Sequence, residues 1–109
     1  MEDLNLKWEK VQQLVKQKFD EELDLQSILF VIGLQELGQN HQMLKKEQKV
    51  EVMHIGICSV LAPFGYYKKL GLDNDGWPHF KNIKKLPNDL VGESQQELLK
   101  KAIVQYFGV

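Results

Sequence analysis

The sequence predicts an all-α protein, a single helical domain over residues 1–109. It should form a compact bundle of four main helices plus a short helix and a long irregular segment before the last helix. Three observations predict this fold. Apolar residues recur at helical spacing near both ends of the chain, two central segments are almost uncharged, and the length suits one hydrophobic core but not two.

The two outer helices are expected near residues 3–20 and 94–107. Each shows apolar residues three or four positions apart with charged residues between them, which is typical of a helix with one buried side. The first stripe is Leu4, Trp8, Val11, Val15 and Phe19, and the last is Leu99, Ala102, Ile103, Tyr106 and Phe107.

The two central helices are expected near residues 25–37 and 46–62. The run 28–34 carries no charge, so we expect it to be buried on every side; a central strand is the alternative for such a run. Asp24 as an N-cap and Gly38 as a helix stop favour the helix. We expect the two helices to pack as antiparallel neighbours and to approach closely at Gly33 and Gly56.

Pro63 should end the second central helix, because proline removes a backbone donor and restricts the residue before it. Proline suits the first turn of a helix, so a short helix is expected over residues 63–70. Residues 72–92 show no period and are expected to be irregular.

Composition narrows the class of protein. Hydrophobic residues make up 43% of the chain and charged residues 27%, as in an ordinary globular domain, and the net charge of −1 makes nucleic acid an unlikely partner. The sequence shows no membrane-spanning run and no secretory signal, so a cytoplasmic protein without membrane contact is expected. The single cysteine, Cys58, should act as a small buried hydrophobe.

No catalytic motif rises above chance, which favours a non-enzymatic protein without a cofactor. Asp73 to Gly76 is expected to be a turn, because the other ligands of a calcium loop are missing. Glu51 and His54 lie one helical turn apart on the second central helix. Antiparallel packing of the two central helices would bring this pair towards Glu36 and His41. A small-molecule or metal site, either purely for binding or enzymatic, is therefore the alternative hypothesis, with the candidate ligands Glu36, His41, Glu51 and His54 and an added contribution from His79.

Half of the ten aromatic residues lie between Phe64 and Phe80. Such residues either form a recognition surface or close the core beneath an irregular segment. Our main functional hypothesis is a helical protein-interaction module that self-associates as a homodimer or binds another protein. The predicted surface is Tyr66, Tyr67, Asp73, Asp75, Trp77, His79 and Phe80. Single-stranded nucleic acid bound by the lysines at 68, 69, 81, 84 and 85 is a third, less favoured hypothesis.

Several strings in the sequence carry a resemblance. They are residues 28–38, with Gln35-Glu36-Leu37-Gly38 at their end, residues 53–63, Gly65-Tyr66-Tyr67, and Asp75-Gly76-Trp77-Pro78-His79. Through these strings the chain resembles, over nearly its whole length, a family of short uncharacterised proteins from Bacteroidota. The resemblance implies a bacterial cytoplasmic protein and carries over no functional residue.

Overall fold

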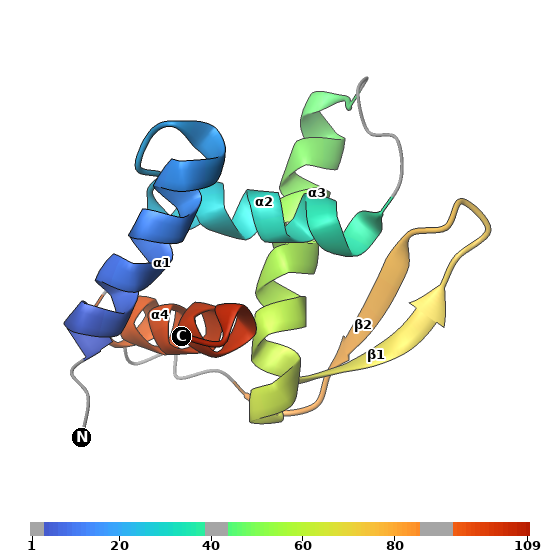
Figure 1. Ribbon diagram of the computed structural model, residues 1–109. Coiled ribbons are helices and arrows are strands. Elements are labelled where there is room, and N and C mark those ends of the chain that lie inside the picture. The colour runs from blue at the N-terminus through green and yellow to red at the C-terminus, as the bar shows by residue number, and fades with distance from the viewer. Residues whose placement is uncertain (1–3, 39–43, 86–92) are drawn as a thin grey trace.

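The computed structural model describes residues 4–38, 44–85 and 93–109 (Figure 1). These residues form four helices, a short 3-10 helix and one hairpin. In chain order they are α1 (Leu4–Phe19), α2 (Leu25–Leu37), α3 (Lys46–Leu61), η1 (Ala62–Phe64), β1 (Tyr67–Leu72), β2 (Pro78–Asn82) and α4 (Glu93–Phe107). The protein is mostly helical, but the two-stranded sheet means that the all-α prediction is only partly right.

The four main helices begin and end within one residue of their predicted positions. The Asp24 side chain caps α2 by accepting a hydrogen bond from the backbone N–H of Ser27 at 2.8 Å. Gly38 ends the same helix with a left-handed conformation, φ 65°. Both helix signals identified in the sequence are therefore confirmed.

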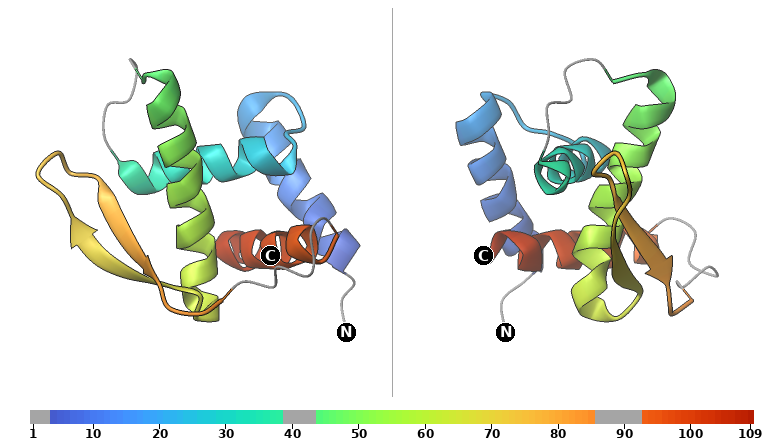
Figure 2. Two further views of the ribbon diagram at one scale, coloured as in Figure 1. Left: turned by 180° about the vertical axis from the view of Figure 1, so that it is seen from behind. Right: turned by 90° about the vertical axis from the view of Figure 1, so that its right-hand side faces the viewer.

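The helices α2 and α3 cross steeply instead of lying antiparallel, as Figures 1 and 2 show from three sides. At the crossing, a Cβ atom added to Gly33 would overlap the carbonyl oxygen of Val52, and one added to Gly56 would overlap the carbonyl oxygen of Leu29. Each glycine thus faces a backbone carbonyl of the other helix, one helical turn before the glycine of that helix. The predicted close approach is confirmed, but the expected antiparallel arrangement is wrong, because the close contact is confined to one crossing point.

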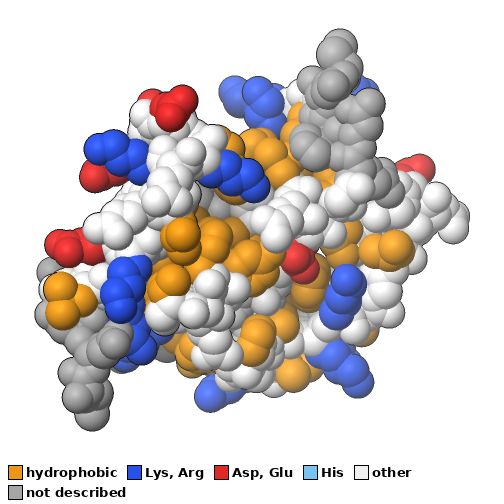
Figure 3. Space-filling view, viewed as in Figure 1, with side chains coloured by type: hydrophobic (Ala, Val, Ile, Leu, Met, Phe, Trp, Pro, Cys, Tyr) orange, Lys and Arg blue, Asp and Glu red, His pale blue; other side chains and the backbone are white. Residues whose placement is uncertain are grey.

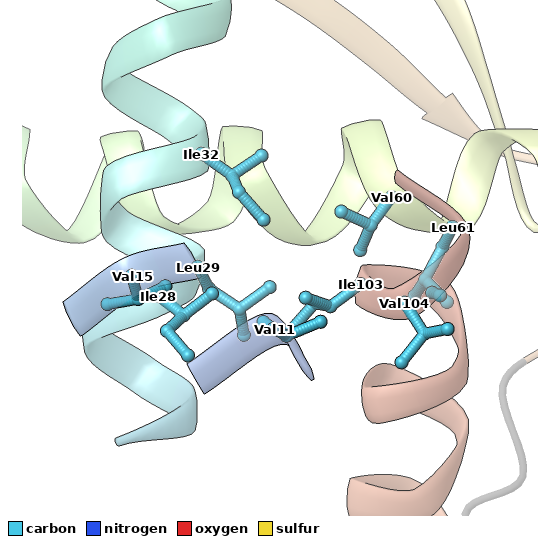
Figure 4. Packing of buried hydrophobic residues seen from close by; sticks show 10 residues of the cluster. Val11, Val15, Ile28, Leu29, Ile32, Val60, Leu61, Ile103 and Val104 are labelled. Carbon is cyan, nitrogen blue, oxygen red and sulfur yellow. The ribbon is translucent and has the colours of Figure 1, made fainter. Parts of the chain in front are cut away.

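The core lies where all four helices meet (Figure 4). The amphipathic helices α1 and α4 cover the crossed pair, as expected, and the buried cluster takes members from each helix. It comprises Val11, Val15, Ile28, Leu29, Ile32, Val60, Leu61, Ala102, Ile103 and Val104. None of the helices in the described ranges has the length and hydropathy of a membrane span.

The short helix expected over residues 63–70 is reduced to the 3-10 turn η1 (Ala62–Phe64), which has Pro63 in its first turn. The 3-10 helix η1 stops at Gly65, which has φ 86°, and β1 begins two residues later. The segment expected to be irregular contains β2, so that prediction is also wrong over residues 78–82; residues 86–92 lie outside the described part. In the hairpin Tyr67 pairs with Asn82 and Lys69 with Phe80, and a bulge follows Lys69.

The hairpin gives no alternating pattern in the sequence because little of it is buried. Every residue of β1 after Tyr67 is exposed, and in β2 only Pro78 is buried. Period-two alternation arises when one face of a strand packs on a core, whereas this hairpin lies beside α3 and none of its described residues belongs to the buried core cluster (Figure 1).

We predict that Gly33→Ala and Gly56→Ala each destabilise the protein by about 1–3 kcal/mol. In an isolated helix alanine is more favourable than glycine by about 1 kcal/mol. Here, however, the added methyl group meets a backbone carbonyl, which cannot rotate away. Urea unfolding measures the change. Gln35→Ala, at an exposed position of α2, is the control, and a glycine variant as stable as this control would contradict the prediction.

Candidate functional site

Two grooves flank the first half of α3. The first, which we call the apolar groove, lies between the end of α1, α2 and α3 and has a volume of about 490 Å³. Its lining is Phe19, Leu23, Gln26, Ser27, Phe30, Val31, Lys49, Val50 and Met53. Figure 3 shows hydrophobic side chains reaching the surface between the upper parts of α1 and α3. One lining residue carries a charge, so the groove is suited to apolar contact.

Local hydrogen bonds fix the corner that forms one wall of this groove. The Gln12 side chain on α1 donates to the carbonyl oxygen of Leu23 at 2.8 Å and accepts from the Leu23 N–H at 3.3 Å. Both backbone groups of Leu23 are thereby paired, although Leu23 lies outside any helix or strand. The capped start of α2 follows directly, so the wall is anchored on both sides.

The sequence did not single out these groove residues, because it predicted that α2 is buried on every side. In the structure Phe30 and Val31 are only half-buried, and Val50 on α3 is 67% exposed. The uncharged run in α2 was nevertheless a signal of a groove in the sequence. A helix that is apolar all round needs cover on every side, and along the groove α2 is covered only in part, because Phe30 and Val31 keep some exposure.

The second groove, the hairpin groove, lies on the other side of α3 and has a volume of about 610 Å³. It is lined by Gln48, Val50, Glu51, His54 and Ile55 of α3 and by Asp73, Asp75, Trp77, Pro78, His79 and Phe80 of the hairpin. The structure therefore brings the Glu51–His54 pair together with most of the predicted interaction surface. Val50 lines both grooves and forms the ridge between them.

Asp73 organises the hairpin turn, as the turn prediction for residues 73–76 requires. Its Oδ1 accepts hydrogen bonds from the N–H groups of Asp75 (2.9 Å) and Trp77 (3.0 Å), and its Oδ2 lies 2.8 Å from Nε2 of His79. Gly76 has φ 83°, which completes a three-residue hairpin loop. The hydrogen bond from the Trp77 N–H is the main cause that lowers the pKa of the Asp73 carboxyl group, and the hydrogen bond with His79 is the second.

The aromatic segment divides into two parts in the structure. Phe64, Tyr66 and Tyr67 pack against the main core cluster, whereas Trp77 and Phe80 line the hairpin groove. The first three residues therefore help to close the core. The last two are available to a ligand or partner.

His54 lies between the groove and the core. Its ring meets the ring of Tyr67 edge to face, with centroids 6.1 Å apart, and its two nitrogens lie 3.8 and 3.7 Å from the sulfur of Cys58. Cys58 is fully buried, and burial raises the pKa of its thiol to about 11. The thiol therefore stays protonated and packs as the small hydrophobe that the sequence suggested.

The structure does not bring Glu36 to Glu51 and His54. Glu36 instead accepts a hydrogen bond from the Tyr106 hydroxyl group of α4 at 2.9 Å, and burial together with this carboxylate raises the pKa of Tyr106. His41 lies outside the described residues. Within the described ranges, no three side chains of His, Cys, Asp or Glu lie close enough together to hold a metal ion.

The hairpin and the residues after it are basic. Lys68 and Lys81 are directly opposite each other in the sheet, and Lys84 Nζ lies 4.8 Å from the centre of the Tyr66 ring. Lys69 and Lys85 are also exposed. These five lysines are the set considered for nucleic acid, and Asp73 and Asp75 at the turn offset part of their charge.

Comparison of the chain with protein-family models, with curated proteins and with solved structures finds no match. The resemblance noted from the sequence therefore stays a prediction, and the candidate function rests on the geometry described above.

We predict that the hairpin amide signals titrate in acid. The lowered pKa means that ionised Asp73 stabilises the turn above the ordinary aspartate pKa of about 3.9 and that this stabilisation is lost as the pH falls through the lowered value. NMR of the Trp77 and Asp75 amides should show this change below about pH 4. In Asp73→Asn the change should be absent, and an unaltered titration in that variant would assign it to another group.

We also predict that Cys58 resists thiol reagents in the folded protein. At pH 8 a thiol with a pKa of about 11 has roughly a hundredth of the thiolate found in an ordinary exposed cysteine, and burial blocks access as well. Reaction with Ellman's reagent should be slow in buffer and complete in denaturant. Fast reaction in buffer would show that Cys58 is accessible in the folded state.

Proposed function

We propose that the protein is a protein-interaction module that binds its partner through the apolar groove and the Val50 ridge. The observation that carries this proposal is the apolar lining of the groove, in which Phe19 and Val50 are exposed and the α2 side is only partly covered. Side chains that are apolar and exposed around one groove are typical of protein interfaces, and Val50 is 67% exposed at its edge.

The groove has the properties of a site for a helix or a compact apolar surface. Its walls are two helices and an anchored corner, so it is held open by the fold. Hydrophobic grooves between helices accept the apolar side of a partner helix, with anchors one turn apart. Phe19 at one edge and Val50 at the other would lie on either side of such an element.

The hairpin groove adds polar and aromatic contacts next to the same ridge. Trp77 and Phe80 supply aromatic surface, and Glu51 and His54 supply polar groups. In an interface that includes Val50, the apolar groove would then form the apolar centre and the hairpin groove a mixed polar and aromatic margin. An apolar centre with a polar margin is the usual anatomy of an interface. This groove also falls within the size range of small-molecule sites, so the small-molecule alternative is retained there, with Glu51, His54 and His79 as its polar groups.

We predict that a photoreactive benzoylphenylalanine at position 50 crosslinks to a polypeptide partner in a native extract or in the purified protein. The same group at position 72, a leucine that is 64% exposed on the hairpin, should give no such adduct. Adding Phe19→Glu across the groove should reduce the crosslink about tenfold, because a charge would then have to enter an apolar contact.

The melting temperature of each variant checks that the fold is retained, since Phe19 and Val50 lie at the surface. Absence of an adduct from position 50, or equal adducts from positions 50 and 72, would contradict the proposed function. Both outcomes are read by gel electrophoresis and mass spectrometry of the crosslinked peptides.

A further inference from the structure

We infer that the partner in the apolar groove is a second copy of this chain, bound about a twofold axis that sets the two apolar grooves against each other. This inference rests on the proposed function and adds the identity of the partner. It is argued from shape and charge around the groove.

The surface is self-complementary in shape. In a twofold interface the same patch must supply both the projecting and the receiving element. Here the projecting element is Val50, 67% exposed, and the receiving element is the groove beside it, whose floor includes Phe30 and Val31. A twofold axis allows each Val50 ridge to enter the groove of the other copy.

The surface is also self-complementary in charge. The corner between α1 and α2 holds four exposed carboxylates within residues 20–24, with no basic side chain among them: Asp20, Glu21, Glu22 and Asp24. The start of α3 holds three exposed lysines, Lys45, Lys46 and Lys49, and one exposed carboxylate, Glu47, so it is basic overall. These two ends lie on opposite sides of the molecule's upper part in all three views of Figures 1 and 2.

A twofold rotation about the middle of the groove exchanges its two ends. The acidic corner of one copy then faces the lysines of the other, twice in each dimer. Lys46, Lys49, Val50 and Met53 follow a spacing of three, one and three, so they lie on one side of α3. The same side that presents Val50 therefore presents the lysines.

Two of these lysines are placed against the local preference of the helix. The N-terminal end of a helix favours negative charge, which Glu47 supplies in the first turn of α3, yet Lys45 is the N-cap and Lys46 the first residue. Carboxylates from another molecule would pair with these two lysines. A polyanion such as nucleic acid would gain there too, but the acidic corner across the groove would repel it.

The test uses two charge-reversed variants of the full chain. Asp20→Lys with Glu21→Lys and Glu22→Lys leaves three lysines and Asp24 at the corner, so both ends of the groove are basic, and Lys46→Glu with Lys49→Glu makes both ends acidic. Each variant should self-associate about tenfold or more weakly than the parent chain in sedimentation velocity, because like charges would face each other twice. An equimolar mixture of the two variants, and a chain that carries all five substitutions, should recover association.

The control is Lys68→Glu with Lys81→Glu on the hairpin, which changes the net charge as much as the second variant but lies outside the groove; its association should match that of the parent chain. Association of the parent should weaken as salt is added, and that of each reversed variant should strengthen. A monomeric parent chain, or recovery absent from the mixture, overturns the inference. If position 50 then crosslinks only to another polypeptide, the proposed function stands without the second copy; if it crosslinks to nothing, both fail.

Discussion

The contact between Gly33 and Gly56 is the constraint on which the rest of the structure depends. Because neither glycine has a side chain, the backbones of α2 and α3 meet directly, with each glycine against a carbonyl of the other helix. The Cα–H groups that replace the missing side chains point at those carbonyl oxygens, a contact that recurs where helices pack closely. A steep crossing confines this close approach to one region. The ends of the two helices then diverge. The space between them has to be filled by α1, α4, the hairpin, solvent or a bound partner.

The distribution of that space explains where the grooves lie. On one side, α1 and α4 bring Val11, Val15, Ile103 and Val104 into the core. On the side of the first half of α3, α1 ends at Phe19 and the chain turns back through Leu23, so Phe30 and Val31 are left half-covered. Across the ridge, the hairpin extends from the far end of α3 and returns alongside it, which leaves the second groove between them (Figure 1). Both grooves therefore follow from the crossing and from the limited length of chain available to cover it.

The sequence predicted the helices well because their signals are local. Asp24, Gly38 and Pro63 mark helix ends through backbone hydrogen bonding, and the amphipathic stripes of the outer helices mark their buried sides. The crossing angle could not be predicted, because Gly33 and Gly56 indicate close approach but not its direction. The hairpin was missed because its strands are exposed on most sides and so lack alternation, although Asp75-Gly76 is a recognised hairpin turn pair. Among the candidate site residues, Glu51 and His54 do share a groove with Trp77 and His79, whereas Glu36 is held by Tyr106 on another helix. That separation depends on tertiary packing, which helical spacing alone does not encode.

The absence of charge along the middle of α2 has two consequences that are physically linked. It lets the helix bury Ile28, Leu29 and Ile32 in the core, and it also leaves the opposite side without a group that water solvates well. In an isolated molecule the exposed apolar side chains reduce the gain from folding, since burial of such surface is the main favourable term. A partner that covers them adds its binding free energy to the stability of the folded state by mass action. The charged residues that flank the uncharged stretch, acidic before α2 and basic at the start of α3, are then the groups that can select which partner binds and in which orientation. In the proposed interface, folding and recognition would therefore both use α2, with its apolar stretch as contact area and with the acidic corner before it and the lysines of α3 as the source of specificity.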